Sequence, residues 1–385
     1  MKRLVLTLCF LFAADPAIGW DQTVGLTEFF PWGRPMYGTL HVQETDFQLD
    51  NLEKILSQAK KLGFSGIRTD IFWHLIEPLA DKRDMKMAEF YRQYFQKIRD
   101  YDFDLLIILS GPPTWATQLL RERPESFWKH YESFVDYAVS SIAPRDTKYF
   151  QLWNEANHIF DPVSKDDFKL FLIGGEGVRR HCPNALTVVN VLSAVPGWQR
   201  QLFSWLQHAG PAIDIVGLDM YPGQWALSAA DDIRDLRELE GLLANNWPEK
   251  KIAVTEMGFS SWGIGKNNQL RRSEVLLNAV HRYLRSSDKK NTSTEFIGWY
   301  QLVDTSRHDE GWHRTKASIQ SLIQFFLNGD LSGFYSVGIE SAFGVMENFT
   351  GGFRLKPVSE VFANQQGAGG YSSPSSSRVK LSVKL

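Results

Sequence analysis

The sequence predicts an α/β protein built as a single (β/α)8 barrel, and three observations lead to this prediction. Short apolar runs rich in β-branched and aromatic residues alternate with amphipathic helical stretches between residues 20 and 363. Eight such units can be counted, which indicates βαβ connections and a parallel sheet. A segment of about 340 residues is long enough for one barrel with some enlarged loops. A doubly wound open sheet is the alternative, and the count of eight favours the barrel.

Eight segments have the composition and length of buried strands. They are 36–42, 65–71, 104–110, 148–154, 185–192, 213–219, 251–256 and 295–302. Each is followed by a stretch in which apolar residues recur with the helical period. The clearest of these stretches are 50–62, 87–100, 125–142, 165–181, 230–245, 269–287 and 315–328. In such a barrel the functional residues lie at the carboxyl ends of the strands, so those ends are where a site is expected.

The two ends of the chain depart from this alternation. Two basic residues precede an apolar run over 4–14 and a cleavage point of small residues, so residues 1–19 are predicted to be a secretory signal peptide. Residues 364–385 begin with a stretch rich in Gly, Ser and Gln, which predicts a flexible tail. The barrel domain is therefore expected to span 20–363, and the protein is expected to be secreted or periplasmic.

The composition argues against several classes of partner. The chain has 385 residues, a formal net charge of −2, 43% hydrophobic and 22% charged residues, which is ordinary for a soluble globular protein. This balance gives no electrostatic reason to expect nucleic acid or an anionic membrane as a partner. No group of His, Cys and acidic residues has metal-ligand spacing and no Gly-rich phosphate loop follows a strand, so no metal and no cofactor are expected. Without the signal, Cys182 is alone and no internal disulfide is expected; we also expect a monomer.

Two glutamates stand at the ends of predicted strands. Glu155 closes the run 149–155, and Glu256 lies in the run 251–258. A carboxylate at the end of a buried strand is poorly solvated, so a fold seldom places one there without a use. The ends of the fourth and seventh strands of a barrel face each other across its mouth, so the two carboxylates could flank one bond. Glycoside hydrolysis requires such a pair, and the adjacent Asn154 could hold a sugar hydroxyl. Either glutamate alone could instead cap the next helix; the pair favours catalysis.

Four strand ends carry motifs in a fixed order. They are Gly66-Ile67-Arg68 on the second strand, Trp153-Asn154-Glu155 on the fourth, Asp219-Met220-Tyr221 on the sixth and Thr255-Glu256-Met257-Gly258 on the seventh. With these motifs, over nearly all of 36–362, the chain resembles clan A of the glycoside hydrolases, which are retaining β-glycosidases on a (β/α)8 barrel. Many members have a histidine where this chain has Asp219, and families five and thirty-nine are both similar to it.

The resemblance implies a role for each of these residues. Glu155 would be the acid/base and Glu256 the nucleophile, with their carboxyl groups about 5–5.5 Å apart as in a retaining enzyme. Arg68 would favour the ionised nucleophile and Tyr221 would orient it. Asn154 would contact the sugar 2-hydroxyl. The implied reaction is the hydrolysis of a β-linked oligo- or polysaccharide through a two-step covalent glycosyl-enzyme. The alternative is a catalytically weak carbohydrate-binding protein on the same barrel.

Aromatic residues and a histidine extend the expected site. Many clan members carry a tryptophan platform at the end of the eighth strand, where this chain has Trp299 followed by Tyr300. Since successive strand residues face opposite ways, only one of the two can face the interior. Trp115, after the third strand, could stack on a sugar ring or pack in a loop, and His41, at the end of the first strand, could contact substrate or be a core histidine. Other loop residues could line outer subsites: Asn157, His158, Trp225, Trp262 and Trp312.

Overall fold

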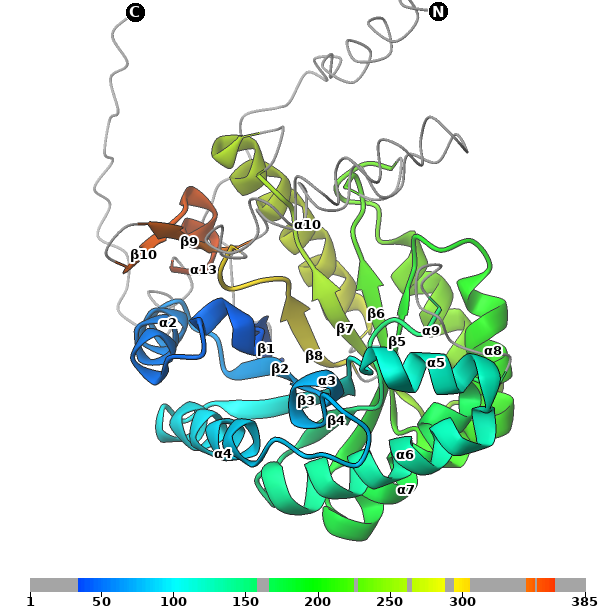
Figure 1. The fold of residues 1–385 in the computed structure, drawn as a ribbon. Helices are drawn as coiled ribbons and strands as arrows, with labels where there is room; N and C mark the ends of the chain where they lie inside the picture. The colour runs from blue at the N-terminus through cyan, green and yellow to red at the C-terminus, as the bar shows by residue number, and fades with distance from the viewer. Residues whose placement is uncertain are drawn as a thin grey trace, which may run out of the picture.

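A closed barrel of parallel strands forms the body of the protein (Figure 1). The computed structural model describes residues 34–157, 166–224, 228–261, 265–287, 294–304, 344–349 and 352–363. The strands follow one another around the barrel in sequence order, and β1 closes it by pairing with β8. The expected (β/α)8 barrel is confirmed, and the alternative of an open sheet is excluded by this closure.

All eight expected strands are present. They are β1 Met36–Thr39, β2 Gly66–Phe72, β3 Asp104–Ser110, β4 Tyr149–Gln151, β5 Leu186–Leu192, β6 Ile215–Met220, β7 Lys251–Met257 and β8 Thr294–Trp299. Their residues are buried almost throughout, as expected for parallel strands covered by helices on one face. The fourth strand is shorter than expected, because the chain leaves the extended conformation before Glu155, which has a φ of 43°.

Helices surround the barrel on its outer side (Figure 1). The longer ones are α2 Leu49–Lys61, α4 Met85–Asp100, α5 Thr114–Glu122, α6 Pro124–Tyr137, α7 Phe168–His181, α8 Trp198–Ala209, α9 Arg234–Asn246 and α10 Lys266–Ser287. The short ones are η1 Val42–Thr45, α3 Trp73–Ile76, η2 Ala138–Ile142, η3 Gly210–Ala212, η5 Pro357–Ser359 and α13 Glu360–Ala363. Helices α5 and α8 were not among the clearest predicted stretches, and the predicted helix 315–328 lies outside the described residues.

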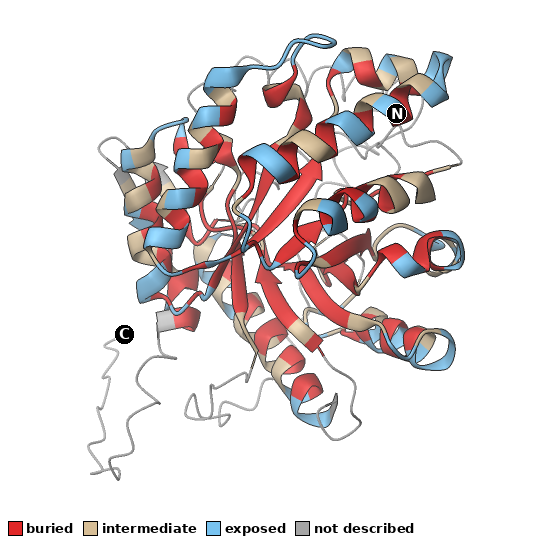
Figure 2. Ribbon diagram, turned by 90° about the horizontal axis from the view of Figure 1, so that it is seen from below, coloured by how far each residue is buried: buried red, intermediate tan, exposed pale blue. Residues whose placement is uncertain are grey.

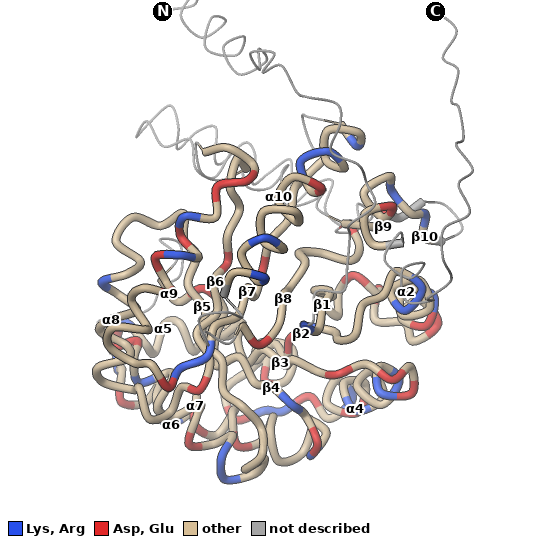
Figure 3. The backbone as a smooth tube through the Cα atoms, turned by 180° about the vertical axis from the view of Figure 1, so that it is seen from behind, with Lys and Arg blue, Asp and Glu red and all other residues tan. Residues whose placement is uncertain are grey.

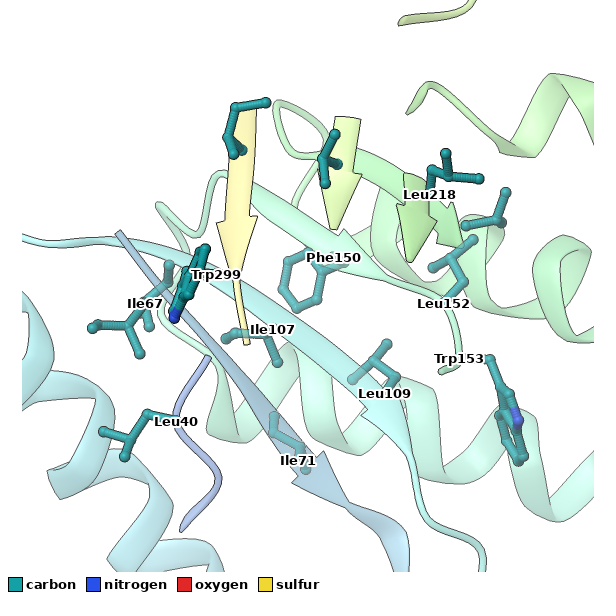
Figure 4. Close-up of a cluster of buried hydrophobic side chains, with 14 of the residues drawn as sticks. Leu40, Ile67, Ile71, Ile107, Leu109, Phe150, Leu152, Trp153, Leu218 and Trp299 are labelled. Atoms are coloured by element: carbon teal, nitrogen blue, oxygen red, sulfur yellow. The ribbon is translucent and has the colours of Figure 1, made fainter. Parts of the chain in front are cut away.

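The buried hydrophobic residues of the described part of the chain form two large clusters and a small third one, which contains Leu192 and Tyr221. The largest cluster lies between the strands and the helices, and Figure 2 shows buried residues along the strands and on the inner faces of the helices. Figure 4 shows members of this cluster, including Ile67 of β2 and Ile107 of β3. The second cluster fills the barrel interior with Tyr37, Leu106, Ile108, Tyr149, Val188, Ile215, Ala253 and Phe296. These residues occupy the amino-terminal portion of the barrel, so its polar interior residues gather at the carboxyl ends of the strands.

A small hairpin follows the barrel and was not expected from the sequence. Strands β9 Met346–Phe349 and β10 Gly352–Leu355 pair antiparallel. Lys356, just after β10, is 1% exposed and lies 3.0 Å from the carboxylate of Asp304, just after β8. The backbone N–H of Gly344 also donates to that carboxylate at 2.7 Å. This partly buried ion pair connects the end of the hairpin to the segment that follows the last barrel strand.

Charged residues of both signs are spread over the outer surface. Figure 3 shows acidic and basic positions interspersed along the outer helices. Several form exposed ion pairs, such as Arg92 with Glu89 on α4 and Arg180 with Asp136 between α7 and α6. Exposed pairs of this kind contribute little to stability. Among the described helices, none combines the length and apolar character that crossing a bilayer requires.

Candidate active site at the carboxyl ends of the strands

Arg68 lies at the centre of the polar layer in the barrel mouth. Its side chain is fully buried, and its Nη1 lies 2.5 Å from Oε1 of Glu256. Its Nη2 donates to Oδ1 of Asn154 at 2.7 Å, and its Nε donates to Oε1 of Gln151 at 3.0 Å. Burial acts to lower the pKa of Arg68, but the carboxylates of Glu256 and Asp219 outweigh it and hold the pKa above its ordinary value. A charged guanidinium therefore joins β2 to the ends of β4 and β7.

Glu256 is held as an oriented anion. It is 5% exposed, and while Arg68 contacts its Oε1, the hydroxyl of Tyr221 donates to its Oε2. Burial, and then the charge of Glu256, raise the pKa of Tyr221 well above its usual value, so the phenol stays protonated and remains a donor. A cation on one oxygen and a neutral donor on the other stabilise the ionised carboxylate and fix its direction.

Glu155 is the more exposed of the two glutamates and follows the end of β4. Its φ of 43° is uncommon for a residue other than glycine, and its backbone N–H donates to Oδ1 of Asn190 at 2.9 Å. Carboxylate oxygens of Glu155, Asp219 and Glu256 lie within 4.8 Å of one another. The structure thus brings together the two glutamates that the sequence singled out, from strands on opposite sides of the barrel.

The amide of Asn154 is oriented by three donors. Its Oδ1 accepts from Arg68, from Nε2 of Gln151 at 3.0 Å and from Nδ2 of Asn190 at 3.3 Å. With its oxygen occupied in this way, the amide keeps its own Nδ2 hydrogens for a ligand hydroxyl. Asn154 is half-buried, so part of the residue remains accessible at the barrel mouth.

Two residues of the site were not identified as site residues from the sequence. Asn190 on β5 and Asp219 on β6 are both buried, and Nδ2 of Asn190 donates to Oδ2 of Asp219 at 2.5 Å. The hydroxyl of Thr255 donates to Oδ1 of Asp219. Burial, followed by the negative charge of Glu256, raises the pKa of Asp219 to about 8. The sequence offered one signal that could have identified such a residue, which is a polar side chain inside a mostly apolar strand. Asn190 is an example in Leu186–Leu192.

The end of β8 resolves which aromatic residue faces the site. Trp299 is fully buried and packs against Phe362 on the outer side of the strand, as Figure 4 shows for its indole among the core residues. Tyr300 packs instead against Tyr221 and His41, with ring centroids 6.2 and 6.1 Å apart. Alternation along the strand explains the difference. We therefore retain Tyr300 as a proposed substrate contact and withdraw Trp299, whose burial leaves it no surface for a sugar.

His41 lies beside Tyr300 at the rim of the site. Its Nδ1 contacts Oδ2 of Asp70 on β2, its backbone N–H donates to Oε2 of Glu44 at 3.0 Å, and its side chain is 23% exposed. Burial alone would lower the pKa of His41, but the Asp70 carboxylate outweighs burial and raises the pKa to about 9. His41 is therefore a charged, partly accessible donor near the mouth, which fits the expected contact with substrate better than a neutral core histidine.

Trp115 and Asn157 have structural partners. The indole N–H of Trp115 donates to the backbone oxygen of Glu77 at 3.2 Å, and its ring packs edge-on against Trp73 and His130. The Asn157 amide pairs with the backbone of Leu192 in both directions at 2.9 Å. These contacts favour the packing alternative for Trp115 and a bracing role for Asn157. His158, Trp225, Trp262 and Trp312 lie outside the described residues.

Two groups of side chains in the described part of the chain bring possible metal-ligand atoms within 4.8 Å of one another. One is Glu77, Asp81 and His130; both oxygens of Glu77 already accept hydrogen bonds, from Trp73 and from the backbone of Asp81. The other is the cluster of three carboxylates in the barrel mouth, which the Arg68 cation, the Tyr221 phenol and the Asn190 amide already contact.

Comparison with known proteins yields structural relatives. No family model matches the chain, and no curated protein does. GH5_18 from Streptomyces cattleya, in complex with GlcNAc, matches with a TM-score of 0.61 and 14% identity over 89% of this chain and 82% of that one. A family 39 glycoside hydrolase from the gut symbiont Bacteroides cellulosilyticus WH2 matches with a TM-score of 0.58 and 18% identity. The match covers 86% of this chain and 64% of that one.

Another match is the exo-beta-1,4-mannosidase Op5Man5 from Opitutaceae bacterium strain TAV5, with a TM-score of 0.59 and 13% identity over 86% of this chain and 58% of that one. At such identities the likeness shows a shared fold. The neighbours are glycosidases and include families 5 and 39. The resemblance inferred from the four strand-end motifs thus agrees with the proteins that share this barrel.

Proposed function

We propose that the protein is a retaining β-glycosidase that hydrolyses a β-linked oligo- or polysaccharide through a covalent glycosyl-enzyme. The observation that supports this most is the separation of Glu155 and Glu256, whose carboxylate oxygens lie within 4.8 Å of each other. Retaining enzymes place the two groups about 5–5.5 Å apart, whereas inverting enzymes leave about 6.5–9.5 Å for a water between them.

In the first step Glu256 attacks the anomeric carbon while Glu155 protonates the leaving oxygen. Arg68 and Tyr221 hold Glu256 ionised and aim it, which keeps the nucleophile ready without a further proton transfer. Their contacts weaken as the Glu256 charge passes into the new ester bond. Asn154 donates to the 2-hydroxyl, where hydrogen bonds strengthen in the oxocarbenium-like transition state.

In the second step a water attacks the glycosyl-enzyme and Glu155 takes its proton. Glu155 suits both roles because it is half-buried at the rim, where a leaving group or a water can approach it. Glu256 departs as a carboxylate into the Arg68 and Tyr221 contacts that held it at the start. The same environment thus assists formation and breakdown of the intermediate.

The similar structures support a carbohydrate substrate, since they include proteins described as a beta-glucosidase and an exo-beta-1,4-mannosidase. Tyr300 and the charged His41 are the proposed sugar contacts at the rim. Export through the signal peptide at residues 1–19 is part of the proposal, and it would place the enzyme where β-linked polysaccharides occur. N-terminal sequencing of exported protein tests that part.

The test of the function is turnover and its stereochemistry. Wild-type protein is incubated with a panel of 4-nitrophenyl β-glycosides, and the anomer formed first is read by proton NMR. Cleavage with first formation of the β-anomer supports the proposal; the α-anomer would show inversion and remove the nucleophile role of Glu256. Glu256→Gln should abolish activity, whereas Glu249→Gln, an exposed change just before β7, should leave it intact. Sugar binding without any cleavage by wild-type protein would indicate a carbohydrate-binding protein instead.

A further inference from the structure

A third carboxylate belongs to the barrel mouth, and it has no place in the two-glutamate mechanism. Asp219 lies on β6, is fully buried, and has a carboxylate oxygen within 4.8 Å of oxygens of Glu155 and Glu256. Because no part of it is exposed, Asp219 cannot touch a substrate. Any effect on the reaction must act through the residues around it.

The hydrogen bonds of Asp219 show which glutamate it acts on. Its Oδ2 accepts from Nδ2 of Asn190 at 2.5 Å, its Oδ1 accepts from the hydroxyl of Thr255, and its carboxyl group also shares a hydrogen bond with the side chain of Glu155. Two carboxyl groups form a hydrogen bond only when one of them carries a proton, because two carboxylates would repel. The donors on β5 and β7 favour the ionised form of Asp219, so the shared proton belongs on Glu155.

The surrounding groups favour one proton shared by the two carboxyl groups. Burial and the negative charge of Glu256 raise the pKa of Asp219, while Arg68 and the hydrogen bonds from Thr255 and Glu155 act to lower it. A single proton between Asp219 and Glu155 removes the repulsion that two adjacent carboxylates would have. The titratable and charged groups that face Asp219 across the barrel mouth are Glu155 beyond β4, Glu256 on β7, Arg68 on β2 and Tyr221 beyond β6.

We propose that Asp219 is a positioning residue that holds the catalytic proton on Glu155 and keeps Glu155 basic after the nucleophile has been esterified. This role rests on the proposed glycosidase function. In the first step the Glu155 proton moves to the leaving oxygen as the glycosidic bond breaks and the bond from Glu256 to the anomeric carbon forms. Glu155 is then a carboxylate facing the Asp219 carboxylate.

The second step reverses this arrangement. Water attacks the anomeric carbon, the ester bond to Glu256 breaks with its electron pair, and Glu155 takes the proton of the water. In a site with two carboxylates the basicity of Glu155 would fall once the charge of Glu256 is lost in the ester. The charge of Asp219 remains, so Glu155 is a stronger base for this step, and protonation restores its hydrogen bond to Asp219.

The pH dependence of Asp219→Asn tests the role. The substitution keeps the shape and removes the negative charge, so Glu155 should lose its proton at lower pH. For the phenyl β-glycoside of the sugar that the wild-type enzyme cleaves, the alkaline limb of kcat/KM should move down by about one pH unit or more. For the 2,4-dinitrophenyl glycoside, whose leaving group needs no proton, the limb should stay in place. Asp50→Asn, the same change at an exposed position on α2, should behave as wild type.

A second variant moves the limb in the opposite direction. Thr255→Val removes a donor that favours ionised Asp219, so the carboxyl pair should hold its proton more tightly and the alkaline limb should move up. This variant also decides the question if circular dichroism shows that Asp219→Asn does not fold. An unmoved limb, or equal movement with both leaving groups, would overturn the role of Asp219 alone. Wild-type protein inactive on every aryl β-glycoside would instead reject the proposed function, and this role with it.

Discussion

Arg68 and Glu256 form a buried ion pair across the mouth of the barrel, with Nη1 2.5 Å from Oε1. The strands that carry them, β2 and β7, are not neighbours in the sheet, so the contact passes through the barrel interior. Neither charge has appreciable access to water, since the side chains are 0% and 6% exposed. Each charge is therefore stabilised mainly by the other and by the hydrogen bonds around them.

Replacing Arg68 by methionine tests this dependence. Glu256 would be left buried without a cation, so we expect the free energy of unfolding to fall by about 3–5 kcal/mol. We also expect kcat/KM to fall by at least about 100-fold, because the nucleophile loses the cation that orients it and balances its charge. Urea denaturation and steady-state kinetics measure the two effects. Arg92→Met, which breaks an exposed pair on α4, should change stability by less than about 1 kcal/mol. Wild-type activity of Arg68→Met would show that the nucleophile does not need the ion pair.

Tyr221→Phe removes the hydroxyl that orients Glu256 and keeps the ring that packs against Tyr300. We expect kcat to fall by about 10- to 100-fold with a smaller change in KM, because the contact aims the nucleophile and does not hold the sugar. The loss of stability should be about 1 kcal/mol. Tyr137→Phe, on the outer helix α6, is the matched control. A raised KM with unchanged kcat would place the hydroxyl in substrate binding instead.

Glu155→Ala should separate the two chemical steps by leaving group. Cleavage of an unactivated glycoside should be crippled, whereas the first step on a 2,4-dinitrophenyl glycoside should be little affected, since that phenolate leaves without a proton. The variant lacks the base for the second step, so the covalent intermediate should accumulate as a burst. Added azide should restore turnover and give a β-configured glycosyl azide. Glu256→Ala should lose activity on both substrates and show no burst. If the two variants exchange these behaviours, the acid/base and nucleophile roles are swapped.

The stability of the protein should fall as the pH rises above neutrality. His41 has a pKa of about 9 in the folded protein against 6.5 in an ordinary environment, because Asp70 outweighs burial. A raised pKa gives stability that is complete below about 6.5 and is lost as the pH passes through about 9. Glu44, whose pKa burial raises from 4.5 to about 8, acts in the same direction. The melting temperature should therefore be lower at pH 9.5 than at pH 6.5.

Substitution of His41 isolates its share of this effect. His41→Gln should reduce the drop in the free energy of unfolding between pH 6.5 and pH 9.5 by about 2–3 kcal/mol, measured by denaturation at both values. His208→Gln, a change on the exposed side of α8, should leave the drop unchanged. Equal pH dependence in wild type and His41→Gln would show that the imidazole titrates alike in the folded and unfolded chain.

The barrel could be predicted from the sequence because its signals are local. Each buried strand is a short apolar run, and a residue at the end of such a run must lie at the barrel mouth, which placed Glu155 and Glu256 correctly at the ends of β4 and β7. The hairpin of β9 and β10 was not predicted, and its place beside the barrel involves a contact between residues far apart in the chain, the ion pair of Lys356 with Asp304.

The interior of the site depends on contacts between strands, which no single run of sequence reveals. Whether Trp299 or Tyr300 faces inward depends on the register of β8, and one residue of slip exchanges them. Asn190 and Asp219 gain their roles only because β5, β6 and β7 are adjacent, so that an amide, a carboxylate and the Thr255 hydroxyl meet. Their presence in apolar strands was visible, but their partners were not.

The charged side chains around Arg68 at the barrel mouth come from both halves of the barrel. Strands β1 to β4 contribute the cation of Arg68, and strands β6 and β7 contribute the carboxylates of Asp219 and Glu256. A fragment of β1 to β4 would therefore contain Arg68 without Glu256, and a fragment of β5 to β8 would contain Glu256 without its cation. Recombining two such fragments would neutralise both at once. The contact between Arg68 and Glu256 therefore exists only when both halves of the barrel are present.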